Sequence, residues 1–247
     1  MAAVWVALLI ASLVAATPPA KWSPDVAAAR AYAQQRTGEI SFHVRTERRG
    51  WSFHADRGVP SASVIKAMLM VAFLNQPNVR RRALGDADHR LLVPMVTRSD
   101  NEAATRVHAI VGGVALERLA RRADMARFSA HPAWGLSRIT ARDQTRLWLR
   151  FESFVARRHR KTALRLLRSI VPEQRWGFGK VPLPPGWKLH FKGGWGRGSG
   201  LVDHQVALLR RRDERVAVAI LTTGNPSHAY GIQTLRGVAK RLLRRLR

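Results

Sequence analysis

The 247-residue chain is long enough for one large domain with a leader, or for two small domains at most. Its hydrophobic fraction of 46% excludes global disorder, and the absence of cysteine excludes disulfides, thiolate metal sites and cysteine nucleophiles. The 43 Lys and Arg against 16 Asp and Glu leave a net charge of +27, which favours association with polyanions.

Residues 1–20 have the pattern of a signal peptide. Their apolar run, Ala2 to Ala16, carries no charge and is shorter than the roughly 20 apolar residues of a membrane span. Val14 and Ala16 supply small residues at a cleavage spacing, and two prolines follow. No Lys or Arg precedes the run, so an uncleaved anchor or a buried helix stays open as an alternative. We expect a secreted or cell-envelope protein whose single folded domain covers residues 21–247.

The first segments of the domain are predicted to be a helix and a hairpin. Residues 25–36 are rich in Ala and favour a helix, with Ser23 as its N-cap. The segment EISFHVRT, residues 39–46, alternates apolar and polar side chains as a strand does. A turn at residues 48–50 then leads to a returning strand at residues 51–55.

The middle of the chain is predicted to be helical. Residues 64–74, VIKAMLMVAFL, are apolar on every side of a helix except at Lys66, which places this helix inside the domain. Residues 85–170 also have a helical character, with basic outer faces.

Strands return in the last third of the chain. One strand begins around residues 188–191, and residues 201–210 and 215–222 alternate as the two strands of a second hairpin. A final amphipathic helix starts at about residue 228.

Strands from both ends of the chain must share one antiparallel sheet if the protein has a single core. We therefore predict an α+β fold whose sheet portion covers about residues 24–60 and 187–247. A helical insert of about residues 61–170 separates the two parts, and the terminal helices cover one face of the sheet.

The tetrapeptide Ser63-Val64-Ile65-Lys66 opens the apolar helix. A three-residue step puts Ser63 and Lys66 on one helix face, and the unpaired N–H groups at a helix start favour negative charge near Ser63. Desolvation of Lys66 among Met, Leu and Val lowers its pKa and makes it a usable base. The alternative is a serine N-cap followed by a lysine that reaches the surface.

Two further motifs follow, Ser99-Asp100-Asn101 and Lys192-Gly193-Gly194-Trp195. A hydroxyl and an amide beside a Ser–Lys pair can relay a proton and orient an amide substrate. The glycines let a substrate lie against the strand edge, and the N–H of Trp195 could join that of Ser63 as an oxyanion hole. In isolation the first motif is typical of a helix cap and the second of a β-turn.

The order of the three motifs is typical of class A β-lactamases and penicillin-binding proteins. The chain resembles this serine hydrolase family at residues 60–74, 95–113 and 191–209, and its last hairpin and closing helix match the usual ending of that fold. The likeness covers most of residues 24–247. It implies one catalytic domain, a three-layer α/β/α sandwich with an antiparallel sheet of about five strands and an inserted all-helical subdomain.

The resemblance also implies a role for each motif residue. Ser63 would be the acylated nucleophile and Lys66 its general base. Ser99 would pass a proton to the leaving group, and Asn101 would hold the substrate amide. Lys192 would polarise Ser99 and pair with a substrate carboxylate.

The chain departs from the family pattern in two places. Its third motif has Gly193 in place of threonine, which removes a hydrogen bond to a substrate carboxylate worth on the order of 1 kcal/mol. The stretch from Asp124 to Thr140 has no Glu to activate a deacylating water; Asp124 falls in a helix-like run, and Glu117 and Glu152 look like surface residues. We therefore expect a serine hydrolase that forms an acyl-enzyme with amide or β-lactam-like substrates and is a weak β-lactamase. A cell-wall peptidase, an esterase-like hydrolase or a slowly turning-over penicillin-binding protein fits this pattern better than an efficient resistance enzyme.

The histidines give weaker patterns. No His pair has the spacing of a zinc motif, and no Gly-x-Ser-x-Gly elbow surrounds Ser63, so a triad with His54 and Asp56 is a minor alternative. We expect no cofactor and no metal, a peptidoglycan-derived peptide or β-lactam as substrate, and a monomer.

Two other functions stay open. One is a degenerate member that binds peptidoglycan or a β-lactam without turnover. The other is a cationic binder of polyanions or membrane surfaces, favoured by the net charge and the basic tail of residues 235–247. No nucleic-acid motif accompanies the charge, so any such partner is expected to be an anionic cell-envelope polymer. Compositional bias toward Arg and Ala is the competing explanation of the charge.

Overall fold

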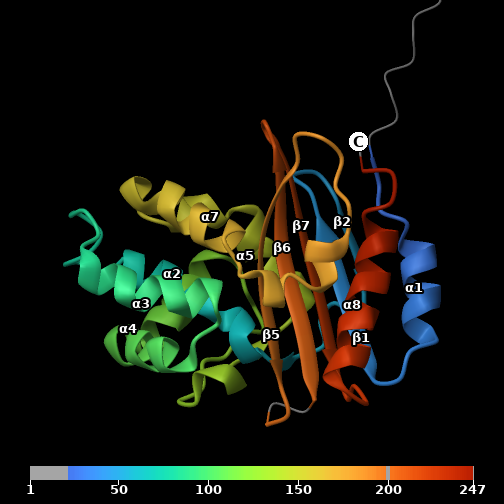
Figure 1. The fold of residues 1–247 in the computed structure, drawn as a ribbon, viewed down its shortest axis with the longest axis horizontal. Helices are drawn as coiled ribbons and strands as arrows, with labels where there is room; N and C mark the ends of the chain where they lie inside the picture. Colours follow the sequence, from blue (N-terminus) through green and yellow to red (C-terminus); the bar gives the residue numbers. More distant parts are fainter. Residues whose placement is uncertain (1–21, 199–200, 247) are drawn as a thin grey trace, which may run out of the picture.

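A five-stranded antiparallel sheet forms the middle layer of the protein (Figure 1). The computed structural model describes residues 22–198 and 201–246. The strand order is β2-β1-β7-β6-β5, so strands from the start of the chain pair with strands from its end, as predicted. The strands are β1 Glu39–Arg45, β2 Gly50–Phe53, β5 Lys188–Gly196, β6 Val202–Arg211 and β7 Glu214–Thr223.

Helices cover both faces of this sheet, which confirms the α/β/α layering (Figure 1). Helices α1 (Val26–Gln34) and α8 (His228–Leu242) lie side by side on one face, and α8 buries Leu235, Val238 and Leu242. On the other face α5 (Ala141–Leu149) packs against β1, β6 and β7. Because both faces are covered, β6 and β7 are buried along most of their length.

The cap of α1 differs from the prediction. Asp25, and not Ser23, is the N-cap, and its carboxylate accepts a hydrogen bond from the N–H of Ala28 at 3.1 Å. Both residue types favour this position, and only the backbone geometry selects between them.

The remaining helices gather beyond the α5 face of the sheet (Figure 1). Helix α2 lies at their centre with all of its residues buried, as a helix without a polar face requires. The α-helices of this group are α2 Lys66–Leu74, α3 Asp86–Thr97, α4 Asn101–Arg122, α6 Phe151–Phe154 and α7 Arg160–Arg168. Short 3₁₀ turns lie at Ala62–Ile65 (η1), Trp134–Leu136 (η2), Arg157–His159 (η3), Pro172–Gln174 (η4) and Gly177–Lys180 (η5).

A small second sheet was not predicted. Its strands β3 (Val59–Pro60) and β4 (Arg138–Ile139) have two residues each, too few for a recognisable alternation. The N–H of Ser61 donates to the carbonyl of Ser137 at 2.8 Å, which continues the pairing. This sheet joins the segment before Ser63 to the loop that follows α4.

The predicted leader, residues 1–20, lies outside the described residues. Within residues 22–198 and 201–246 no helix combines the length and the apolar character that crossing a membrane requires.

Candidate active site

Ser63 and Lys66 are one turn apart in a 3₁₀ helix that leads into α2. The N–H of Lys66 closes this turn on the carbonyl of Ser63. Side chains at positions i and i+3 eclipse one another in a 3₁₀ helix, so both leave the backbone on the same side. Ala62, just before Ser63, has a φ of 43°, a left-handed conformation that is rare and strained for alanine.

The hydroxyl of Ser63 has no hydrogen-bond partner within the described part of the chain. The residue is 8% exposed. A serine at this position can therefore meet a ligand without first breaking an internal hydrogen bond.

Lys66 is completely buried, which excludes the alternative of a lysine that reaches the surface. Its Nζ donates to the carbonyl of Ser99 at 2.5 Å and to Oδ1 of Asn101 at 2.7 Å. The same Nζ lies 3.3 Å from Oγ of Ser99. Burial lowers the pKa of Lys66 from 10.5 to about 7, and the negative charge of Asp100 only partly opposes this.

A neutral Lys66 has the right valence for a base in this position. An uncharged amine has two N–H groups and one lone pair. Ser99 and Asn101 supply two acceptors for the two N–H groups. The lone pair then faces the third partner of Nζ, Oγ of Ser99 at 3.3 Å, and can accept a proton.

The second motif lies in the short connection between α3 and α4, and its residues divide two tasks. The carboxylate of Asp100 accepts from the N–H of Ala103 at 2.7 Å and caps α4, so the helix-cap interpretation holds for this residue. Ser99 and Asn101 instead contact Lys66. Ser99 has a φ of 57°, and such strain in a non-glycine residue is typical of functional sites.

Lys192 reaches the same serine from strand β5. It is 1% exposed, and its Nζ donates to Oγ of Ser99 at 3.0 Å and to the carbonyl of Gly193 at 2.9 Å. Burial, followed by repulsion from Lys66, holds the pKa of Lys192 well below its usual value. Two lysines thus converge on one hydroxyl, and neither has an ion pair with a carboxylate in the described part of the chain.

Glycines let strand β5 pass directly against the turn that carries Ser63. A Cβ at Gly194 would lie 2.8 Å from the backbone nitrogens of Ser63 and Val64, too close for any other residue. Trp195 follows Gly194 in the same strand.

The lysine-glycine-glycine departure has a packing reason. A Cβ at Gly193 would lie 2.9 Å from Cη2 of Trp176. Trp176 therefore occupies the space that a threonine side chain at position 193 would need.

Trp134 is a site residue that the sequence did not reveal. Its ring centroid lies 4.9 Å from Nζ of Lys66, and its Nε1–H donates to Oγ1 of Thr105 at 3.2 Å. It belongs to the stretch 124–140, where no Glu was found. An aromatic ring, and not a carboxylate, faces Lys66 from this loop. A tryptophan in a short loop is a usable signal, but its direction depends on packing.

The three carboxylates weighed in the sequence as activators of water, Asp124, Glu117 and Glu152, are engaged elsewhere. Asp124 is not in a helical run, as the sequence suggested, but in a turn with a φ of 56°, where it pairs with Arg150 at 3.5 Å. Glu117 accepts from the N–H of Ala130 at 2.6 Å, and Glu152 pairs with Arg210 at 3.2 Å. Each of these contacts lies outside the hydrogen bonds of Lys66.

Trp195 also belongs to an aromatic cluster that the sequence did not indicate. Its ring stacks on His228 at 5.8 Å, and Trp176 meets both rings edge-on. Nδ1 of His228 lies 2.5 Å from Oδ1 of Asp203, and burial raises the pKa of Asp203 to about 6. A cavity of about 420 Å³ opens beside this cluster, at the end of β5 next to the site.

The minor alternative of a histidine triad is wrong. The two oxygens of Asp56 accept from Arg142 at 2.8 and 2.9 Å, and His54 packs on the ring of Phe53. Neither side chain contacts Ser63. Within residues 22–198 and 201–246 no group of three His, Asp or Glu residues is placed to hold a metal ion.

The fold and the converging Ser-x-x-Lys, Ser-x-Asn and Lys-Gly-Gly motifs define the class of serine hydrolases with a β-lactamase or penicillin-binding architecture. A sequence model described as the β-lactamase enzyme family matches residues 89–246, more than half of the chain. The protein belongs to this family. A search of curated protein sequences finds no match to this chain.

Solved structures share the fold of this chain. A β-lactamase from Sphaerobacter thermophilus superposes with a TM-score of 0.75 at 19% identity over 90% of this chain and 97% of its own. An ancestral class A β-lactamase superposes with a TM-score of 0.71 at 16% identity, over 87% of this chain and 96% of its own. A variant of PBP-A, in an acyl-enzyme complex with penicillin G, superposes with a TM-score of 0.71 at 16% identity, over 88% of this chain and 93% of its own. At these identities the likeness concerns the fold.

Proposed function

We propose that the protein forms an acyl-enzyme on Ser63 with amide or β-lactam-like substrates and hydrolyses it slowly. The observation that carries the proposal is the buried lysine: Lys66 is uncharged in a substantial fraction of molecules near neutral pH and stands one 3₁₀ turn from Ser63. A serine hydroxyl is a weak nucleophile until a base of suitable pKa accepts its proton.

The groups of this site can accept and return every proton that acylation moves. Neutral Lys66 takes the proton of Ser63, and the serine oxygen bonds to the substrate carbonyl carbon. The N–H groups of Ser63 and Trp195 stabilise the oxyanion. When the C–N bond breaks, Ser99 gives its proton to the leaving nitrogen, and protonated Lys66 restores the proton of Ser99.

Substrate binding follows from the groups around Ser99. The amide of Asn101 uses its oxygen for Lys66, which leaves its NH₂ for a substrate carbonyl. Lys192 supplies positive charge for a substrate carboxylate, although Gly193 has no hydroxyl to assist it. A peptidoglycan-derived peptide or a β-lactam has an amide and a carboxylate in the required relation.

Slow deacylation follows from the ring of Trp134. Hydrolysis of the acyl-enzyme needs a group that activates water. The loop that reaches Lys66 offers an aromatic ring at 4.9 Å, which accepts no proton. We therefore propose that the acyl-enzyme accumulates and that any β-lactamase activity is weak.

Labelling with a fluorescent penicillin tests acylation. The parent protein should carry one covalent adduct that survives denaturation, and intact-protein mass spectrometry should give the mass of the opened β-lactam. Ser63→Ala should remove the label completely. A folded parent protein that takes up no label would favour the rival function, binding without covalent chemistry.

Export is part of the same proposal, because peptidoglycan lies outside the cytoplasmic membrane. The apolar leader at residues 1–20 supports it. Mass spectrometry of protein expressed with its leader should give an N-terminus close to residue 17 or beyond in the exported fraction. A full-length chain retained in the cell would contradict the proposal.

A further inference from the structure

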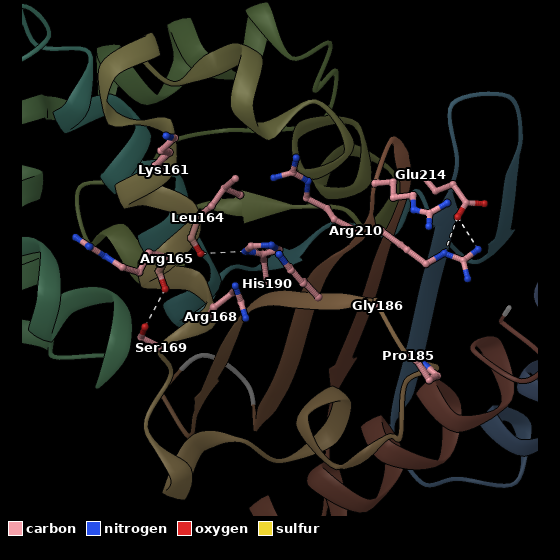
Figure 2. A pocket seen from close by; sticks show the side chains of 13 residues that line it. Lys161, Leu164, Arg165, Arg168, Ser169, Pro185, Gly186, His190, Arg210 and Glu214 are labelled. Atoms are coloured by element: carbon pink, nitrogen blue, oxygen red, sulfur yellow. Dashed lines mark hydrogen bonds and ion pairs between the residues drawn. The ribbon is translucent and has the colours of Figure 1, made fainter.

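A large cavity lies near the other end of strand β5 from Trp195 (Figure 2). Its volume is about 1210 Å³. Helix α7, the start of β5 and the β6–β7 hairpin form its walls. Seven of its thirteen lining residues are cations: Lys161, Arg165, Arg168, Lys188, Arg210, Arg211 and Arg212. We name these seven residues and their cavity the basic cavity.

Helix α7 presents an ordered row of charge to the basic cavity. Lys161, Arg165 and Arg168 follow the i, i+4, i+7 spacing of one helix face, which extends about 10 Å along the axis. All three side chains are exposed. Figure 2 shows Arg165 and Arg210 on opposite sides of His190 in this view.

Glu214 and Glu152, two carboxylates near the basic cavity, are already paired, whereas Asp213 at the turn of the β6–β7 hairpin lies outside the lining. Glu214, the one acidic residue of its lining, binds Arg211 at 2.6 Å. Glu152 binds Arg210 at 3.2 Å and Arg215 at 3.8 Å. The other five cations have no carboxylate partner in the described part of the chain: Lys161, Arg165, Arg168, Lys188 and Arg212. Such uncompensated charge in a concave surface attracts anions strongly.

His190 responds to the same charge. It is 3% exposed, and its Nδ1 faces the carbonyl of Leu164 at 2.9 Å, so Nδ1 carries the hydrogen. Burial, together with the positive charges of Arg210, Arg168 and Lys188, lowers the pKa of His190 to about 4. The imidazole is therefore neutral at pH 7 and adds no charge of its own.

The composition of the lining selects among anions. Guanidinium groups bind phosphate through paired N–H donors, and a large cavity with five unpaired cations suits a ligand with several charges. No Phe, Tyr or Trp lines the cavity, and Arg211 covers the ring of the adjacent Trp187 at 5.0 Å, so the lining itself gives the bases of a single-stranded nucleic acid no ring on which to stack.

We propose that the basic cavity binds a linear phosphate chain without bases, joined by phosphoanhydride or phosphodiester links and laid along helix α7. This binding is independent of acylation at Ser63. An extended polymer of this kind would hold the protein on an anionic surface.

Binding of an inorganic oligophosphate of about ten phosphates, measured by calorimetry at ~0.1 M salt, tests the proposal. The variant Lys161→Ala/Arg165→Ala/Arg168→Ala should bind at least about tenfold more weakly, with a shallower salt dependence. Alanine preserves the helix propensity of α7. The matched control, Arg121→Ala/Arg236→Ala/Lys240→Ala, removes the same charge from exposed positions on α4 and α8. Its affinity for the oligophosphate should fall by less than about threefold.

Equal weakening in the two triple variants would overturn the proposal, because net charge alone would then explain binding. So would an absence of binding, or equally tight binding of polyglutamate with the same number of charges. A single-stranded oligonucleotide that binds more tightly than the oligophosphate would also contradict it. A parallel measurement with poly(glycerol phosphate) identifies the kind of polymer. An affinity comparable to that of the oligophosphate supports a phosphodiester polymer, and tighter binding of the oligophosphate supports a phosphoanhydride chain.

Discussion

The two basic regions along strand β5 use their cations in opposite ways. Near Trp195, Lys66 and Lys192 are buried and meet at the hydroxyl of Ser99. In the basic cavity, Arg165 and the other four cations without a carboxylate partner are exposed. Neither region has enough carboxylates to neutralise its charge. Burial therefore decides what a cation does, because it lowers the pKa of an amine, whereas exposed cations stay charged and attract anions.

Lysine and arginine are distributed accordingly. Of the two side chains, only the amine of lysine can lose its proton near neutral pH when it is buried. Both buried cations of the candidate active site are lysines. The basic cavity has five arginines and two lysines, and arginine keeps its charge in every environment. The comparison can be tested by changing the burial, the charge or the surroundings of Lys66.

The largest expected effect follows removal of the buried amine. Lys66→Ala should slow acylation of Ser63 by about a thousandfold, because general-base catalysis contributes roughly 10² to 10⁴. Stopped-flow labelling with a fluorescent penicillin measures the rate. Lys240→Ala, an exposed lysine on α8, should leave the rate unchanged. A Lys66→Ala rate within tenfold of the parent would mean that another group accepts the proton.

The pH profile should report the buried amine directly. The pKa of Lys66 is about 7, so its neutral fraction falls tenfold for each pH unit below that value. Acylation should therefore rise with pH, level off above about pH 8, and be about a hundredfold slower at pH 5 than on the plateau. Rates measured across this range with Lys66→Ala should lack the rise. A parent profile that is flat from pH 5 to 8 would show that Lys66 is not the base.

The aromatic ring beside Lys66 should control how long the acyl-enzyme survives. Trp134→Glu places a carboxylate near Nζ of Lys66 and should shorten the lifetime of the acyl-enzyme by about tenfold, because it offers a base for water. Trp134→Phe keeps a ring and should retain the long lifetime. Decay of the adduct mass after removal of free penicillin gives both rates. Equal lifetimes in the two variants would place control of deacylation elsewhere.

The smallest expected effect is on stability. The pKa of Lys66 is lowered from 10.5 to about 7, so between these values the unfolded chain binds more protons than the folded protein. Stability of the parent should therefore rise with pH in this window, by about 1 kcal/mol from pH 7 to pH 8. Lys66→Met lacks this contribution. Urea denaturation at pH 7 and pH 8 gives the free energy of unfolding of each protein. The value for the parent should increase relative to that of Lys66→Met as pH rises. A constant difference would mean that Lys66 titrates outside this range.

Local patterns predicted much of the site before any contact was known. The i, i+3 step placed Ser63 and Lys66 together, and an all-apolar helix predicted the burial of Lys66. The contacts of Lys66 and Lys192 with Ser99 join residues 33 and 93 positions apart. Only the resemblance to a family linked these motifs beforehand, since spacing alone gives no pairing between distant segments.

The features that the sequence missed share a cause. Trp134 faces Lys66 because strands β3 and β4 pair, and each is too short to leave a pattern. Trp176 excludes a side chain at Gly193 through a contact between a loop and a strand. The cap of α1 was misplaced from Asp25 to Ser23 because both residue types suit that position.

The sequence by itself determined the α+β class, the buried lysine and the excess of positive charge. The first two follow from patterns among neighbouring residues, and the third follows from the composition of the chain. The tertiary structure decided which of the cations lost contact with water and which faced an open cavity. That choice depends on how the sheet and helices pack, and burial rather than residue type sets the charge state of an amine.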